Sequence, residues 1–197
     1  MNKLVIASNN PGKLREFQHM LAPLGIEVLT QSQLGISEAE EPHCTFVENA
    51  LAKARHVSRA SGLPALADDS GICVDALGGA PGVQSARYAG GSPKSDRRNN
   101  DKLLQDMLGV ADRRAHYYCV LVLVRHADDP QPIIAEGEWH GEIAHAERGD
   151  GGFGYDPMFW LPELGKMSSE LSYDEKHAIS HRGRAMKVLL EKLKLKM

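Results

Sequence analysis

The sequence predicts an α/β fold, and the prediction rests on two features near the N-terminus. Residues 4–6 form a short aliphatic run that ends at a polar turn, residues 8–13, as a buried strand entering a loop does. Apolar residues then recur at helical spacing from Leu14 to Leu24, and residues 26–30 form a second short strand-like run. The order strand, turn, helix, strand is that of an α/β unit, in which ligands bind near the carboxyl end of the first strand.

The composition is that of an ordinary globular chain. Of its 197 residues, 42% are hydrophobic and 25% are charged, and the net charge is -3. This balance lacks the basic surplus expected of a protein that binds long nucleic acids or anionic membranes, although a small anionic ligand needs only a local cluster. We therefore expect a single domain over residues 1–197, with no nucleic acid polymer and no membrane among its partners.

The cysteines indicate a reducing compartment. Cys44, Cys73 and Cys119 are widely spaced and form no CxxC pair, so we expect neither a disulfide framework nor a zinc knuckle. The apolar run at the N-terminus is too short for a signal peptide, and the longest one, residues 119–124, cannot span a bilayer. These observations predict a cytoplasmic protein.

Caps and turn residues predict where two helices begin and end. Asn10 and Pro11 are suited to the cap and the first turn of the helix that follows residues 8–13. Thr45 and Glu48 stand at capping-box spacing, and Gly62 ends the helical pattern that follows them.

Four further apolar runs predict strands that extend the sheet. They are residues 66–67, 72–77, 115–124 and 133–139. Between the first two, the adjacent carboxylates of Asp68 and Asp69 predict a break in the strand. Residues 101–108 and 184–196 show helical spacing, whereas the glycine-rich segment 149–157 predicts a shaped loop.

The turn at residues 8–13 is a candidate phosphate site. It lies at a helix N-terminus, where free N–H groups and the helix dipole favour an anion, and Lys13 adds a full charge. The segment has neither the GxxxxGK[ST] spacing of a P-loop nor the GxGxxG of a dinucleotide turn. A capped helix with a solvated lysine explains these residues equally well.

The two aspartates after residues 66–67 are candidate metal ligands. Neighbouring residues of a strand point to opposite faces, so Asp68 and Asp69 would not chelate one ion as a pair. A hard cation would need another carboxylate, such as Glu40 or Glu41, and Mg²⁺ suits that arrangement because it keeps waters and shares phosphate oxygens. The alternative is an Asx-type turn without a ligand.

Three more groups of residues have a functional interpretation. Asn49 and Lys53 lie on one helical face, but a capping glutamate with a solvated lysine accounts for that helix as well. The rings of Phe153 and Tyr155 stand among glycines, where stacking on a base is possible. Near the last helix, basic residues lie close to a possible cap, and they are either ligand donors or merely exposed. They are Lys176, His181 and Arg182, with Ser180 as the cap.

Two catalytic classes are disfavoured. The histidines show no HExxH or comparable pairing, so we do not expect a zinc site. Ser70 is not surrounded by a GxSxG elbow, which argues against a serine nucleophile.

Six motifs, taken together and in order, resemble one family. They are SNNPGK (8–13), EExxxTFxENAxxKA (40–54), LADDSG (66–71), GGAPG with SARYAG (85–90), GGFGYDP (151–157) and EKxxISHR (175–182). The chain resembles, over essentially its whole length, the inosine triphosphate pyrophosphatase family and specifically its bacterial dITP/XTP pyrophosphatases. Where many members have Thr-Gly-Asn, this chain has Ser8-Asn9-Asn10, which keeps the hydroxyl and the second asparagine.

The resemblance implies a fold and a reaction. The fold would be an elongated two-lobed α/β structure around a long central mixed sheet, with the nucleotide in the cleft between the lobes, and the protein would be a homodimer. The reaction would convert a purine nucleoside triphosphate and water to the monophosphate and pyrophosphate, with Mg²⁺ as cofactor. The implied substrates are the deaminated purine nucleotides ITP, dITP and XTP.

The resemblance also implies a role for each matching residue. The triphosphate would contact Lys53 and the N-terminal turn: Ser8, Asn9, Asn10, Pro11, Gly12 and Lys13. Glu41 and Asp69 would position Mg²⁺, Asp69 would be the general base, and Ser70 would contact substrate, with Asp68 and Glu48 in support. The base would be stacked or bounded by Phe153, Gly154, Tyr155 and Asp156, and its 6-keto oxygen would accept from Lys176, His181 and Arg182.

Two other functions fit parts of the pattern. The Maf-like nucleotide pyrophosphatases share the broad fold and phosphate chemistry, but their usual arginine pair soon after the first strand is absent from this sequence. A nucleotide-sensing module would bind without hydrolysis, and the presence of Glu41, Lys53 and Asp69 argues against it.

Overall fold

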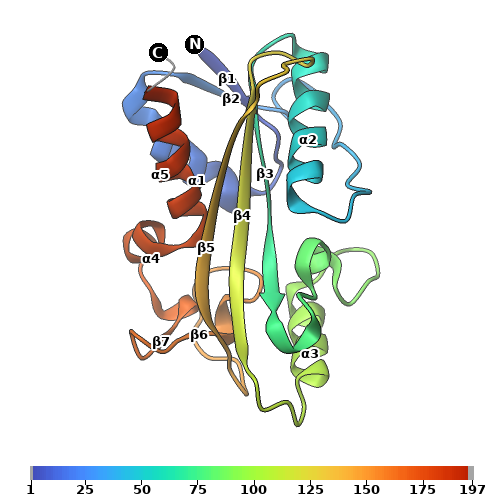
Figure 1. Cartoon of the computed structure of the whole chain (residues 1–197), viewed down its shortest axis with the longest axis vertical. Coiled ribbons are helices and arrows are strands. Elements are labelled where there is room, and N and C mark those ends of the chain that lie inside the picture. The colour runs from blue at the N-terminus through green and yellow to red at the C-terminus, as the bar shows by residue number, and fades with distance from the viewer. Residues whose placement is uncertain (1, 195–197) are drawn as a thin grey trace. The chain divides into compact units, whose positions relative to one another are not determined.

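A computed structural model describes residues 2–194 and confirms the α/β class (Figure 1). The strands are β1 (Lys3–Ile6), β2 (Glu27–Thr30), β3 (Ala65–Val74), β4 (Arg114–Val124), β5 (Ile133–Ile143), β6 (Phe159–Leu161) and β7 (Lys166–Met167). The helices are α1 (Pro11–Leu21), α2 (Phe46–Ser61), α3 (Asp96–Asp106), α4 (Tyr173–Ile179) and α5 (His181–Lys194).

The strands form one mixed sheet in the order β2-β1-β3-β4-β5-β6-β7. β1 pairs in parallel with β2 and β3, whereas β6 is antiparallel to β5 and β7. The chain divides into two compact units, and β3, β4 and β5 contribute residues to both. Unit 1 contains the chain up to Asp69, residues 119–136 and the chain from Ala185 on, and unit 2 contains residues 70–118 and 137–184.

Unit 1 has helices on both faces of its part of the sheet. α1 and α5 share a core with the strands on one face, where Leu4, Ile6 and Phe17 are fully buried. α2 lies on the other face (Figure 1), with Ala50 and Ala54 fully buried. The alternation of side chains along the strands explains why both faces need a helix.

Unit 2 has a core of its own. Apolar residues of α3 and of the strands pack there against aromatic rings from the segment after β5, and Tyr155 and Phe159 are among them.

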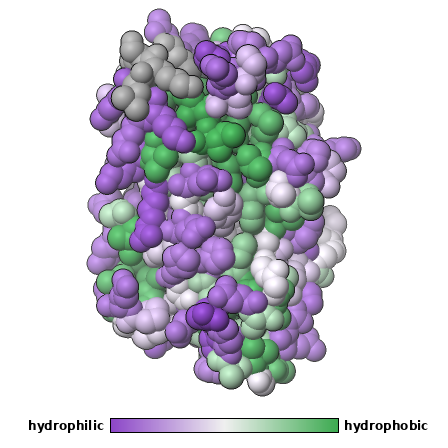
Figure 2. Space-filling view, viewed as in Figure 1, coloured by the Kyte–Doolittle hydropathy of each residue, from purple (hydrophilic) through white to green (hydrophobic). Residues whose placement is uncertain are grey.

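Figure 2 shows that hydrophilic residues cover most of the visible surface and that hydrophobic ones gather mainly in the upper part of the view. Within residues 2–194, every helix is too short or too polar to cross a membrane.

The helix caps of α1 and α2 confirm the sequence prediction. The Asn10 side chain accepts hydrogen bonds at the start of α1, and the Thr45 hydroxyl accepts one from the N–H of Glu48 at the start of α2. Gly62 ends α2 with a φ of 69°, a left-handed conformation that favours glycine.

β3 corrects one prediction. The strand does not break at Asp68 and Asp69 but runs without interruption from Ala65 to Val74. It tolerates two adjacent carboxylates because each is paired with a lysine from a different helix. The strand predicted over residues 72–77 therefore ends at Val74, and residues 75–77 form a 3-10 turn.

Two helical boundaries and one whole helix also differ from the prediction. α3 begins at Asp96 rather than at residue 101, because Ser95 caps it. α4 was not predicted, although Ser172 and Glu175 form a capping box at its start. α5 begins at His181, and its predicted end at residue 196 lies outside the described residues.

Candidate functional site

The turn at residues 8–13 is organised by its own side chains. The Asn10 carboxamide oxygen accepts from the N–H groups of Gly12 and Lys13 at 2.9 and 3.1 Å, and the Asn10 N–H donates to Ser8 Oγ at 3.2 Å. Asn9 donates to Glu38 at 3.0 Å. An anion at this helix N-terminus would therefore share its N–H donors with the Asn10 side chain.

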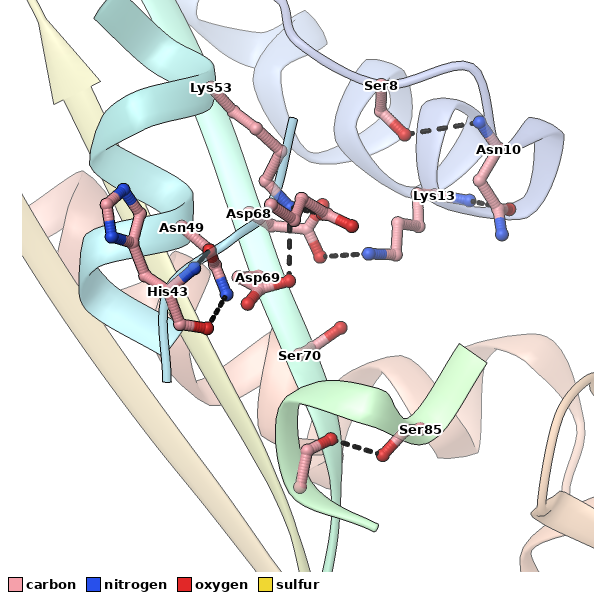
Figure 3. Close-up of polar contacts among 12 residues, drawn as sticks. Ser8, Asn10, Lys13, His43, Asn49, Lys53, Asp68, Asp69, Ser70 and Ser85 are labelled. Atoms are coloured by element: carbon pink, nitrogen blue, oxygen red, sulfur yellow. Dashed lines mark hydrogen bonds and ion pairs between the residues drawn. The ribbon is translucent and has the colours of Figure 1, made fainter. Parts of the chain in front are cut away.

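Asp68 and Asp69 contact lysines from two different helices (Figure 3), as expected of neighbouring strand residues, which point to opposite faces. Asp68 Oδ2 lies 2.7 Å from Lys13 Nζ, on the α1 side. Asp69 Oδ1 lies 3.1 Å from Lys53 Nζ, on the α2 side. The two aspartates therefore do not form one chelating pair, and each anchors a lysine that the sequence placed in a phosphate site.

Lys53 lies between two carboxylates. Its ammonium group is 2.7 Å from Glu41 Oε1 and 3.1 Å from Asp69 Oδ1, and its side chain is only 13% exposed. The interpretation of Lys53 as a solvated surface lysine is therefore wrong. Burial alone would lower the pKa of Lys53, but Asp69, Asp68 and Glu41 outweigh it, so the pKa is raised and the group stays charged.

Asp69 combines burial with incomplete hydrogen bonding. Its Oδ2 atom is buried and has no hydrogen-bond partner in the described part of the chain. Burial raises the pKa of Asp69, and Lys53 and Lys13 reverse only part of that increase. A carboxylate with a raised pKa and one unused oxygen has the properties expected of a proton acceptor or of a ligand for a cation.

The segment that carries Glu41 is attached to α2. The buried side chain of Asn49 pairs with the backbone of His43, two residues beyond Glu41 (Figure 3). Glu48, which we expected to support the site, is exposed and accepts a hydrogen bond from the Thr45 hydroxyl at 2.5 Å, so its contact belongs to the helix cap.

Asp156 is the organising carboxylate of the loop at residues 149–157. It is 2% exposed, and its oxygens accept from the Phe153 N–H at 2.8 Å, from Ser168 Oγ at 2.8 Å and from the Lys176 ammonium. Nothing in the sequence pointed to Ser168, because a lone serine far from the loop gives no local signal. The contacts of Asp156 fix both the loop and the lysine.

The aromatic residues of this loop differ in exposure. Phe153 is 39% exposed, and Lys176 Nζ lies 4.8 Å from the centre of its ring. Tyr155 is 3% exposed, and its hydroxyl donates to the Ser85 carbonyl at 2.7 Å, so its ring is a core residue of unit 2. Gly154 donates its N–H to Asp96 at 2.8 Å.

The basic residues at the start of α5 are buried rather than solvated. Arg182 is 3% exposed and donates to Ser70 Oγ at 3.0 Å. His181 is 5% exposed and stacks on Tyr117, with ring centres 4.7 Å apart. Ser180 accepts from the N–H of Gly183 at 3.2 Å and is the predicted cap. The interpretation of His181 and Arg182 as exposed basic side chains is therefore wrong.

The donor set fits a divalent cation that shares its shell with phosphate. Across residues 2–194, no three His, Cys, Asp or Glu side chains are placed to hold a metal ion. Glu41 and Asp69 do reach the same cation, the Lys53 ammonium, and Asp69 Oδ2 is buried with no partner among the described residues. Two carboxylates with further oxygens from water and phosphate are a common Mg²⁺ environment.

Comparisons with known proteins agree with the motif resemblance. Residues 4–192 match the Ham1 family. A dITP/XTP pyrophosphatase from Ralstonia nicotianae is 68% identical, with 99% of this chain and 98% of that protein covered. A dITP/XTP pyrophosphatase from Nitrosomonas europaea is 67% identical, with 98% and 95% covered. The solved structure of a HAM1 protein from Coxiella burnetii has a TM-score of 0.93 at 45% identity, covering 98% of this chain and 99% of that one.

Proposed function

Because the chain belongs to the Ham1 family, we propose that it is a dITP/XTP pyrophosphatase, the activity for which its relatives are named. It would convert dITP, ITP and XTP to the monophosphate and pyrophosphate, and so keep deaminated purines out of DNA and RNA. The observation that carries the proposal is the cluster of Glu41, Lys53 and Asp69, in which a buried carboxylate with one unused oxygen lies beside a cation.

The triphosphate would be bound by residues 8–13 and Lys53. The ammonium groups of Lys13 and Lys53 supply full positive charges, and the N-terminus of α1 adds a partial one. Both lysines are already held by the carboxylates of β3 at 2.7 and 3.1 Å, which supports a preorganised site. Side chains fixed in this way lose little conformational entropy when the substrate binds.

Glu41 and Asp69 would hold Mg²⁺, with phosphate oxygens and water completing its shell. When bound, the metal ion neutralises phosphate charge that otherwise repels a nucleophile. The support for this assignment is that both carboxylates, which come from separate segments of the chain, contact one ammonium group.

Asp69 would act as the general base. Its carboxylate would orient a water and take its proton while the oxygen attacks the α-phosphorus, and the bond to the β-phosphate would break as pyrophosphate leaves. The raised pKa of Asp69 supports this role, because a more basic carboxylate takes the proton more readily. Lys53 would stabilise the negative charge that develops on the phosphate oxygens.

The base would be bound by the loop at residues 149–157 and by side chains of α4 and α5. Phe153 would stack on the purine, Gly154, Tyr155 and Asp156 would shape the edge of the pocket, and Ser70 would contact the substrate. The 6-keto oxygen would accept from donors on α4 and α5, namely Lys176, His181 and Arg182. The 6-amino group of adenine presents hydrogens instead and would leave these donors unpaired, so we expect ATP to be disfavoured roughly 10⁴-fold. The half-exposed Phe153 ring beside the Lys176 ammonium supports this assignment.

We also propose that the enzyme is a cytoplasmic homodimer without a nucleic acid polymer or a membrane among its partners. The family resemblance supports the dimer. The three cysteines, which show no disulfide or zinc spacing, support a reducing compartment.

A pyrophosphate-release assay with ITP, XTP, GTP and ATP tests the proposed function. We expect Mg²⁺-dependent release of pyrophosphate from ITP and XTP, loss of activity with a chelator, and much slower release from ATP. A sensing module would bind the nucleotides and release nothing, whereas a Maf-like enzyme would prefer other bases. Either result would overturn the proposal.

A further inference from the structure

An asparagine in α2 holds the segment of chain that carries Glu41. Asn49 is 2% exposed, and both polar atoms of its carboxamide bond to the backbone of His43 (Figure 3). Its Oδ1 accepts from the His43 N–H at 3.0 Å, and its Nδ2 donates to the His43 carbonyl at 3.1 Å. The side chain thus pairs with the backbone of His43 as a neighbouring strand would.

The attached segment has no regular structure of its own. Residues 37–43 form neither helix nor strand, and most of their side chains are exposed. Two other contacts reach its far end: His56 Nε2 lies 2.9 Å from the Ser37 carbonyl, and Glu38 accepts from Asn9. Of these contacts, that of Asn49 is nearest in the chain to Glu41.

The same helix therefore contacts the segment twice near Glu41. Asn49 and Lys53 are four residues apart on α2, and they reach the backbone of His43 and the carboxylate of Glu41, respectively. The ion pair alone is a weak constraint, because the Glu41 side chain is 26% exposed and the pair must offset the entropy of two long side chains. The two part-buried hydrogen bonds of Asn49 supply the constraint on the backbone.

We propose that Asn49 is a positioning residue that holds Glu41 against Lys53 and Asp69 for the reaction proposed above, on which this inference rests. Both polar atoms of the Asn49 carboxamide bond to the backbone of His43, two residues beyond Glu41. Asn49 would therefore affect the reaction by fixing the position of Glu41. Sites that depend on geometry are sensitive to displacements of about 1 Å, which can reduce the rate roughly 100-fold. A purely structural asparagine would instead lower stability without any link to Glu41.

A double-mutant cycle separates these two roles. We expect Asn49→Ala to lower kcat/KM for ITP by roughly 10- to 100-fold. In a Glu41→Gln background, where the carboxylate to be positioned is already lost, the same substitution should have an effect of no more than about twofold. Asn49→Asp, which keeps the acceptor for the His43 N–H, should fall between Asn49→Ala and the wild type, and it provides a second variant should Asn49→Ala fail to fold.

Asn99 provides a matched control. It is 3% exposed, lies in α3 and accepts from the Ala89 N–H at 2.9 Å, so it too joins a helix to a backbone segment. Asn99→Ala should change kcat/KM by the same factor whether or not Glu41 is replaced. Amide hydrogen exchange adds a readout that is independent of activity: the His43 amide should be protected in the wild type and exchange faster in Asn49→Ala.

The outcomes distinguish this inference from the proposed function. If the wild type hydrolyses ITP and the loss caused by Asn49→Ala persists undiminished beside Glu41→Gln, Asn49 is structural and the inference is wrong. Unchanged exchange at His43 overturns it equally. If the wild type releases no pyrophosphate from ITP or XTP, the proposed function fails, while the exchange experiment still tests whether Asn49 holds the segment.

Discussion

The ammonium group of Lys53 lies 3.1 Å from one carboxylate oxygen of Asp69, and the other oxygen is buried without a hydrogen bond from the described residues. Leaving a buried polar atom unsatisfied costs free energy, so folded proteins rarely keep one without a use for it. We therefore assign the role of general base to Asp69, whose carboxylate has only one of its oxygens hydrogen-bonded.

Asp69→Asn should remove most turnover but not substrate binding. An amide of the same shape cannot take a proton from water, and loss of a general base lowers rates by roughly 10²- to 10⁴-fold. Steady-state kinetics with ITP, together with calorimetric binding of ITP to the variant, provide the check. Near-normal turnover in this variant would show that Asp69 is not the base.

In the metal-free protein, Asp69 should ionise above the ordinary range for an aspartate. Burial raises the pKa of Asp69, and Lys53 and Lys13 reverse only part of that increase. Bound Mg²⁺ would favour the ionised carboxylate, so the measurement is an NMR titration of the Asp69 carboxyl carbon without metal, with a midpoint expected above the usual value of about 3.9. A midpoint at or below that value would contradict the expected effect of burial.

Arg182→Ala should weaken the discrimination between ITP and ATP. Arg182 is buried and donates to Ser70, and its loss removes a charged donor proposed for the 6-keto oxygen. We expect the ratio of kcat/KM values to fall at least about tenfold, since such hydrogen bonds contribute about 1.5–3 kcal/mol. Arg184→Ala is the matched control, because Arg184 lies two residues further along α5 and donates to the Glu138 carbonyl instead. An unchanged ratio in Arg182→Ala would refute the role in reading the keto group.

Asp129→Ala should destabilise the fold without changing substrate choice. The Asp129 side chain is 1% exposed and accepts from Arg125 and from the Gln131 N–H, and its loss should lower the free energy of unfolding by about 2 kcal/mol. The neighbouring Asp128 is 86% exposed, so Asp128→Ala should cost less than about 1 kcal/mol. Urea denaturation of both variants gives the comparison, and equal losses would contradict the prediction.

The contribution of Asp129 should also depend on pH. The hydrogen bond from the Arg125 side chain holds the pKa of Asp129 well below its usual range and outweighs burial. A lowered pKa in the folded state stabilises the protein fully above the unfolded-state value of about 3.9, and this stabilisation is lost as the pH falls further. The difference between wild type and Asp129→Ala should therefore shrink in acid, and a constant difference would be evidence against it.

The sequence predicted those structural features that depend on residues close together in the chain. The caps at Asn10 and Thr45 depend on hydrogen bonds within one turn of helix, and both are present. The opposite directions of Asp68 and Asp69 follow from the strand period alone. These parts of the site were therefore readable from the sequence.

Features that depend on distant partners were not readable. β3 continues through its two carboxylates because lysines from α1 and α2 neutralise them, and no local pattern announces such partners. Ser168 reaches Asp156 only after the chain has folded. α4 is different, because its Ser172–Glu175 capping box is a local signal, whereas its short sequence shows no clear helical spacing of apolar residues.

Hydrolysis of ITP in ¹⁸O-labelled water tests the central claim most directly. The proposed reaction has the water that Asp69 activates attack the α-phosphorus, so a single turnover should place the label in the monophosphate and leave pyrophosphate unlabelled, as measured by mass spectrometry. Label in pyrophosphate, or release of inorganic phosphate in place of pyrophosphate, would contradict it.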